Sequence, residues 1–299
     1  MLKLDAPRDT DIHTLADFTE LLCLLTPDRI CSRNYLLDFV KDNSDKKLDE
    51  DDLDDCFAQF TWRVAAFGES YPFRLDAHGN VLSSSENLSD SQQLYAFLLL
   101  CANLPFVEHG DRQSLTDAFE RAALCALRRL WPETAETVPF GKNQTAYTGA
   151  KWERLFKLGT DIGGRPQVND KTFRPNDSGD GGIDLVAWLD LDSHEKSNIP
   201  SALAQCACSR AEWPIKQTAI SGTRLHRQLG PSHPWMEMIF IPQSFRNNQG
   251  RWAVDGEIGS AIVMDRLRLV GRLNVELDWN SIAPPGVFTE FLAQRLELV

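Results

Sequence analysis

The chain has 299 residues, of which 42% are hydrophobic and 25% are charged, proportions typical of an ordinary globular protein. No stretch reaches the roughly 20 consecutive apolar residues that cross a bilayer, and residues 1–13 lack the apolar centre of a signal peptide, so we expect a cytoplasmic protein without membrane association. The net charge is −12, and residues 1–150 carry −11 of it, so we expect that half to repel nucleic acid.

The first part of the chain, residues 1–145, is predicted to be mainly helical. Apolar residues at helical spacing predict five helices, over residues 11–25, 32–41, 49–67, 89–104 and 114–130. Residues 71–84 predict a β-hairpin that turns at Gly79. We expect this acidic helical region to serve assembly or regulation.

Prolines and a glycine interrupt the helical pattern in residues 131–144 and predict a domain boundary near residue 145. Helices and strands are mixed beyond it: helices over residues 148–164, 213–229 and 286–299, strands over 182–191, 201–209 and 234–243, and a strand with helical or irregular chain over 261–273. This order predicts an α/β core with a mixed sheet in residues 146–299.

Two neighbouring apolar strands each contain one polar residue. Both faces of residues 183–189 are apolar apart from Asp184, a pattern typical of a covered central strand. A carboxylate there loses favourable hydration unless it is paired or binds a cation. Gln205 has a similar place in the next strand. Taken alone, Asp184 is best explained as a strand-edge carboxylate bonded to backbone amides of the glycine turn at residues 179–182.

Together, GDGGIDLVAW at residues 179–188 and AQCACS at residues 204–209 resemble the PD-(D/E)XK nuclease superfamily, particularly its Mrr-type, restriction-endonuclease-like branch. The resemblance covers residues 147–275. Members place an aspartate early in one core strand and a Glu/Gln-x-Lys triplet in the next. The resemblance implies that Asp184 and Gln205 bind Mg²⁺, or Mn²⁺ in its place. It also assigns to Glu153 the glutamate that some members carry on the first core helix; the alternative is an exposed helix acid.

The sequence departs from the family's pattern at the lysine of the triplet, because residue 207 is alanine and cannot activate water. Some members carry this lysine on the helix after the second strand. Lys216 follows Pro214, a residue suited to a helix start, and is therefore the expected replacement. The alternative is that Lys216 is a solvated lysine and the fold has lost its activity.

The resemblance implies a Mg²⁺-dependent DNA endonuclease acting in bacterial defence against phage. It implies a partner protein such as an ATPase, helicase or sensor, or a homo-oligomer formed through the N-terminal region. Weaker candidates for phosphate contacts are Arg210, Arg224 and Arg227. Two alternatives stay open: an inactive nuclease-fold module that binds DNA or a protein, and an RNA-cleaving effector. The seven cysteines lack zinc-type spacing, so we expect free thiols.

Overall fold

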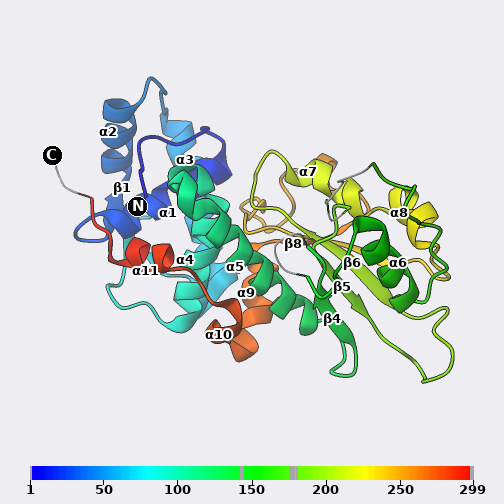
Figure 1. The fold of residues 1–299 in the computed structure, drawn as a ribbon. Coiled ribbons are helices and arrows are strands. Elements are labelled where there is room, and N and C mark those ends of the chain that lie inside the picture. Colours follow the sequence, from blue (N-terminus) through cyan, green and yellow to red (C-terminus); the bar gives the residue numbers. More distant parts are fainter. Residues whose placement is uncertain (1, 142–144, 175–178, 180, 297–299) are drawn as a thin grey trace. The chain divides into compact units, whose positions relative to one another are not determined.

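The structure, a computed structural model, describes residues 2–141, 145–174, 179 and 181–296, and its chain divides into two compact units (Figure 1). Unit 1 contains Met1–Ala118, Pro242–Asp255 and Asp265–Val299; unit 2 contains Phe119–Ile241 and Gly256–Met264. The division therefore differs from the predicted boundary near residue 145. The irregular-looking residues 131–144 contain a strand of unit 2, and the C-terminal segments return to unit 1.

Unit 1 is mainly helical, as predicted. Its helices are α1 (Ile12–Leu25), α2 (Arg33–Asn43), α3 (Glu50–Phe67), α4 (Asp90–Ala102), the first part of α5 (His109–Arg128), α9 (Arg266–Leu273), α10 (Trp279–Ile282) and α11 (Gly286–Ala293). A small antiparallel sheet has the order β1-β3-β2 and consists of β1 (Ile30–Ser32), β2 (Phe73–Leu75) and β3 (Val81–Ser84). The predicted hairpin is confirmed, and Gly79 turns it with a φ of 70° that favours glycine.

Four fully buried charged side chains form what we call the buried ion cluster in the core of unit 1: Asp17 and Glu20 on α1, Arg63 on α3 and Arg266 on α9. Arg63 Nη1 lies 2.8 Å from Asp17 Oδ1 and 2.7 Å from Glu20 Oε1. Arg266 Nη2 lies 2.8 Å from Asp17 Oδ2, and its Nη1 lies 3.7 Å from Glu20 Oε2. Each charge thus contacts both charges of opposite sign, and the cluster joins three helices that are distant in sequence.

Unit 2 is built on a five-stranded mixed sheet with the order β4-β5-β6-β7-β8. Its strands are β4 (Glu136–Pro139), β5 (Leu185–Trp188), β6 (Ser201–Cys206), β7 (Met236–Phe240) and β8 (Ile262–Met264). The first three strands pair antiparallel, whereas β6, β7 and β8 are parallel. The predicted α/β class with a mixed sheet is confirmed. The sequence did not predict β4, an edge strand whose Pro139 is tolerated because an edge needs fewer backbone donors.

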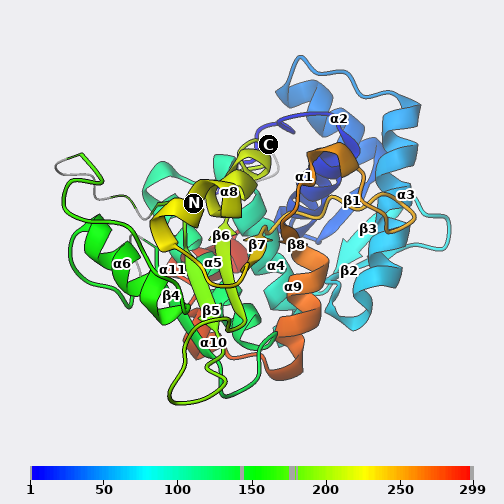
Figure 2. The same cartoon turned by 90° about the vertical axis from the view of Figure 1, so that its right-hand side faces the viewer.

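Helices α6 (Lys151–Asp161) and α8 (Gly222–Leu229) lie beside this sheet (Figure 2). Leu155 of α6 and Leu225 of α8 belong to one buried cluster with Val186 and Leu203 of the central strands. The helix predicted over residues 213–229 is broken: α7 (Trp213–Lys216) passes into a 3₁₀ turn, η3 (Gln217–Ile220), before α8 begins. Within the described residues no helix has the length and apolar character needed to span a membrane.

Candidate active site at the end of strands β5 and β6

Asp184 lies immediately before β5 and is fixed by backbone bonds on both sides. Its N–H donates to Ala204 O of β6 at 2.9 Å, and its carbonyl oxygen accepts from the N–H groups of Phe140 and Gly141, which follow β4. Only 7% of the residue is exposed. These bonds extend the sheet past β5, so the position of the carboxylate is set by three strands rather than by a loop.

One oxygen of the Asp184 carboxylate is held by β6. Asp184 Oδ2 accepts from the Cys206 N–H at 2.7 Å and from Gln205 Nε2 at 3.0 Å. Gln205 is 7% exposed. The structure therefore brings the two predicted residues together, but the contact is made by the amide nitrogen of Gln205, and its oxygen Oε1 points elsewhere, toward Gly182.

The other oxygen of the Asp184 carboxylate faces a second acid, Glu120. A Cβ built on Gly141 would lie 3.5 Å from Asp184 Oδ1 and 3.6 Å from Glu120 Oε2. The two carboxylates therefore flank one small volume beside Gly141. Glu120 belongs to α5, is half-buried, and follows the fully buried Phe119.

Glu120 was not predicted from the sequence. It follows the buried Phe119, and the residues three and four positions later, Ala123 and Leu124, are buried as well, so Glu120 is an acid beside apolar helix positions. The domain boundary predicted near residue 145 placed all of α5, and therefore Glu120, outside the domain that contains the sheet.

Glu153, the predicted helix acid of the site, has a different place. Its side chain is on the first turn of α6, exposed, and its Oε2 accepts the Ala150 N–H at 2.7 Å. Within the described part of the chain it forms no hydrogen bond with Asp184, Gln205 or Lys216. A carboxylate at this position satisfies a backbone donor that the helix leaves unpaired and favours the positive end of the helix dipole.

Lys216 reaches the same end of the sheet from α7. Its Nζ donates to Cys206 O at 3.4 Å, and the N–H of the same Cys206 binds Asp184. The lysine is half-buried rather than fully solvated. Ala207, at the expected lysine position, is 1% exposed and follows directly in the chain. The half-buried ammonium thus contacts the same residue, Cys206, whose N–H binds the carboxylate.

The charges of the site converge on the thiol of Cys206. Burial raises its pKa well above the usual range, the carboxylates of Asp184 and Glu120 raise it further, and Lys216 lowers it. With no metal ion bound, Cys206 is therefore a neutral thiol at physiological pH. As predicted, neither Cys206 nor Cys208 forms a disulfide within the described residues.

Arg224 of α8, one of the weakly predicted arginines, lies beside Gly182 and Gln205. A Cβ on Gly182 would lie 3.0 Å from Arg224 Nη1 and 3.4 Å from Gln205 Oε1. It would also lie 2.7 Å from the Ala219 Cβ, and Gly182 has a φ of 82°, so this close approach requires glycine. Arg227 is exposed on α8, and Arg210 is half-buried in the turn after β6.

The donor set fits a weakly held divalent cation rather than a closed metal cage. Across residues 2–141, 145–174, 179 and 181–296, no group of three Asp, Glu, His or Cys side chains could hold a metal ion by itself. Mg²⁺ usually takes one or two carboxylates and completes its shell with water and substrate phosphates. Two carboxylates flanking one volume meet that requirement.

A scan against protein-family models, a search of curated proteins and a search of solved structures each gave no match to this chain.

Proposed function

We propose that unit 2 is a divalent-cation-dependent phosphodiesterase that cleaves nucleic acid, with DNA as its substrate. The observation that carries the proposal is the pair of carboxylates, Asp184 and Glu120, that flank one volume beside Gly141 at the end of the central strands. The proposal keeps the resemblance to the PD-(D/E)XK nucleases for Asp184 and Gln205. It replaces Glu153 by Glu120 as the acid contributed by a helix.

Asp184 Oδ1 and Glu120 Oε2 would hold Mg²⁺ in this volume. When bound, Mg²⁺ polarises a phosphoryl oxygen and offsets negative charge on the leaving oxygen. The bonds from Cys206 N–H and Gln205 Nε2 to Asp184 Oδ2 orient the carboxylate, so that its other oxygen faces Glu120. Such outer contacts fix a ligand's direction before the ion binds.

Two cations of the chain support the handling of a phosphodiester here. Lys216, held at Cys206 O, supplies a positive charge near the reacting phosphate, where a preorganised donor stabilises developing negative charge. Arg224 Nη1 and Gln205 Oε1 both lie near Gly182, and Arg224 offers a guanidinium to a neighbouring phosphate. The hydrogen bond from Arg224 Nη1 to the backbone oxygen of Ala219, 2.9 Å long, positions this group.

The test compares two glutamates in a nicking assay. Purified full-length protein is incubated with supercoiled plasmid DNA and Mg²⁺, with a chelator in the control. We expect Glu120→Gln to lower the nicking rate at least about a hundredfold, the scale for losing one positioned charge-stabilising group. The matched variant Glu153→Gln should cleave at the wild-type rate, since that side chain caps α6. Equal rates for both variants would contradict the assignment.

A second candidate, a nuclease-fold module that binds DNA or protein without cleaving, is favoured by one observation. The expected lysine position is the buried Ala207, and the cation nearest the carboxylate's backbone partner comes from another element. Specific DNA binding with no nicking of DNA or cleavage of RNA, in either Mg²⁺ or Mn²⁺, would support this candidate and end the proposal of an enzyme. Cleavage of RNA alone would redirect the proposal to an RNA-cleaving effector.

A further inference from the structure

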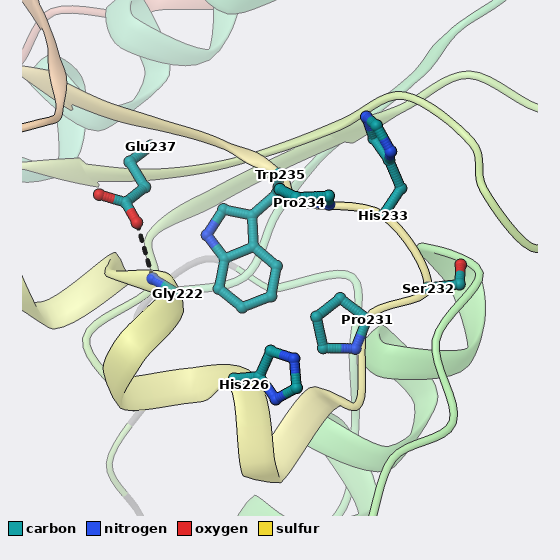
Figure 3. Close-up of a pocket in the computed structure, with 8 residues that line it drawn as sticks. All are labelled: Gly222, His226, Pro231, Ser232, His233, Pro234, Trp235 and Glu237. Carbon is teal, nitrogen blue, oxygen red and sulfur yellow. Dashed lines mark hydrogen bonds between the residues drawn. The ribbon is translucent and has the colours of Figure 1, made fainter.

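A cavity of about 390 Å³ lies in unit 2 between α8 and the segment that leads into β7 (Figure 3). Its walls are rings: His226 of α8, and Pro231, His233, Pro234 and Trp235 of the segment before β7. The volume is within the range of about 300–1,000 Å³ that small-molecule sites occupy. The cavity therefore has the size and ring-lined walls of a site for one planar group.

The walls of the cavity are held in place by hydrogen bonds. Trp235 is only 7% exposed, and its Nε1 donates to Ile220 O at 2.9 Å. Glu237 Oε1 accepts the Gly222 N–H and its Oε2 accepts the Ser260 hydroxyl, each at 2.6 Å. The floor is thus preformed, and a ligand would meet little ordering cost on entering.

The chemistry of the cavity matches a planar heterocycle with hydrogen-bonding groups at its edge. His226 and His233 are exposed, so their rings can stack on a bound ring and their nitrogens can donate or accept hydrogen bonds. The Glu237 carboxylate adds an acceptor for an amino group. Nucleobases combine a flat apolar face with such donors and acceptors, and proteins that extrude a base hold it in this way.

The cavity and the candidate active site share one face of the sheet. The register of β6 and β7 pairs Leu203 with Glu237 and Gln205 with Ile239. Gln205 and Glu237 therefore point to the same face, and Gln205 lies two residues, about 7 Å, further along the strands. Helix α8 connects the two places, because Arg224 approaches Gly182 while His226 lines the cavity.

We infer that this cavity is a nucleobase pocket, which receives the base of a nucleotide next to the phosphate held at Arg224. The inference rests on the proposed function and deepens it: the substrate would be a strand with at least one unpaired or extruded base. A phosphate at one side of α8 and a base at the other would fix the register of the strand relative to Asp184.

The experiment measures binding without cleavage. A labelled single-stranded oligonucleotide of about ten nucleotides is titrated with full-length protein in a buffer that contains a metal chelator. Fluorescence anisotropy gives the Kd of the protein for this strand. A strand of equal length with abasic sugars keeps every phosphate but offers no base. We expect the His226→Ala/His233→Ala double variant to bind the normal strand about tenfold more weakly, the scale for losing stacking on one base. Its Kd for the abasic strand should equal that of the wild type.

His194→Ala is the matched control, because His194 is an exposed histidine in the loop between β5 and β6; its Kd values should not change. Each single variant is measured as well, so that a folding defect in one cannot decide the result. Titration with deoxyadenosine monophosphate tests the source of the base: binding that is lost in the double variant extends the pocket to free nucleotides, and no binding restricts it to strands. An unchanged Kd for the normal strand, or equal weakening for both strands, would overturn the inference.

The two proposals fail separately. Base-dependent binding without plasmid nicking would support the nucleobase pocket and contradict the proposed enzyme activity. Plasmid nicking, together with a Kd for the oligonucleotide that does not change when His226 and His233 are replaced, would support the enzyme activity and contradict the nucleobase pocket.

Discussion

Each unit of this protein buries a carboxylate in its core, and the two are surrounded very differently. In unit 1, Asp17 is 1% exposed, and its two oxygens face two fully buried arginines, Arg63 and Arg266. In unit 2, Asp184 is 7% exposed and has one oxygen held by β6, while the other faces a second acid, Glu120.

Under the proposed function, the contrast is between a structural buried charge and a catalytic one. Opposite charges surround Asp17 on a closed set of helices, so removing one member leaves its partners uncompensated. Asp184 lies at the end of the sheet with a second acid beside it, an arrangement that a shared cation would stabilise. Both carboxylates are buried, so the difference between them lies in the groups that surround each one.

The largest expected effect is on cleavage by Asp184→Asn. The amide oxygen can still accept from Cys206 N–H and Gln205, so the fold should keep its stability to within about 1 kcal/mol. Loss of the negative charge should lower the nicking rate by about a thousandfold or more, because several kcal/mol of cation-derived stabilisation disappears. Chemical denaturation without Mg²⁺ and plasmid nicking with Mg²⁺ measure the two effects. Full activity of the purified variant would remove Asp184 from the site.

The same change in unit 1, Asp17→Asn, should have the opposite profile. It turns one oxygen into an amino group that faces a guanidinium, and leaves Arg63 and Arg266 with one carboxylate between them. Breaking a buried ion pair costs about 3–5 kcal/mol. Urea unfolding should show this loss, while molecules that remain folded nick DNA at the wild-type rate. Unchanged stability would mean that the buried ion cluster is not a structural element.

Lys216→Ala tests the cation that replaces Ala207. We expect a nicking rate lower by at least about a hundredfold, with little change in DNA affinity, because one charge is a small part of many phosphate contacts. Lys196→Ala is the control, since Lys196 is exposed on a loop and pairs with Asp190 at 3.5 Å. Equal rates for the two variants would show Lys216 to be an ordinary lysine of α7.

The smallest effect is expected from Gly141→Ala, which probes the volume between the carboxylates. The new methyl would meet its neighbours at 3.5 Å or more, so the fold should accept it. It would occupy space that the cation needs, and the Mg²⁺ concentration for half-maximal nicking should rise about tenfold, as for changes next to metal ligands. An unchanged Mg²⁺ dependence would place the cation elsewhere.

Much of the fold could be predicted from the sequence because its signals are local. The predicted helices of unit 1 follow the apolar spacing, and Asp11, Ser32 and Ser89 accept the N–H groups that begin α1, α2 and α4. In unit 2 the two central strands were found where continuous apolar runs predicted them. β4 was missed, because four residues ending in proline carry almost no pattern, and pairing with β5 alone makes them a strand.

The sequence by itself determined that Asp184 and Gln205 are polar groups within two apolar runs, and that Lys216 lies in a helical turn after them. These properties depend on residues that are close in the chain. The tertiary structure alone decided which charges share a site. In the folded chain, Glu120 and Asp184 lie on either side of Gly141, whereas Glu153 caps the start of α6. Arg266 binds Asp17, which is 249 positions away in the sequence. The physical reason is that the energy of a buried charge depends on distances in space between side chains, and periodicity along a sequence carries no information about the sign of a distant partner.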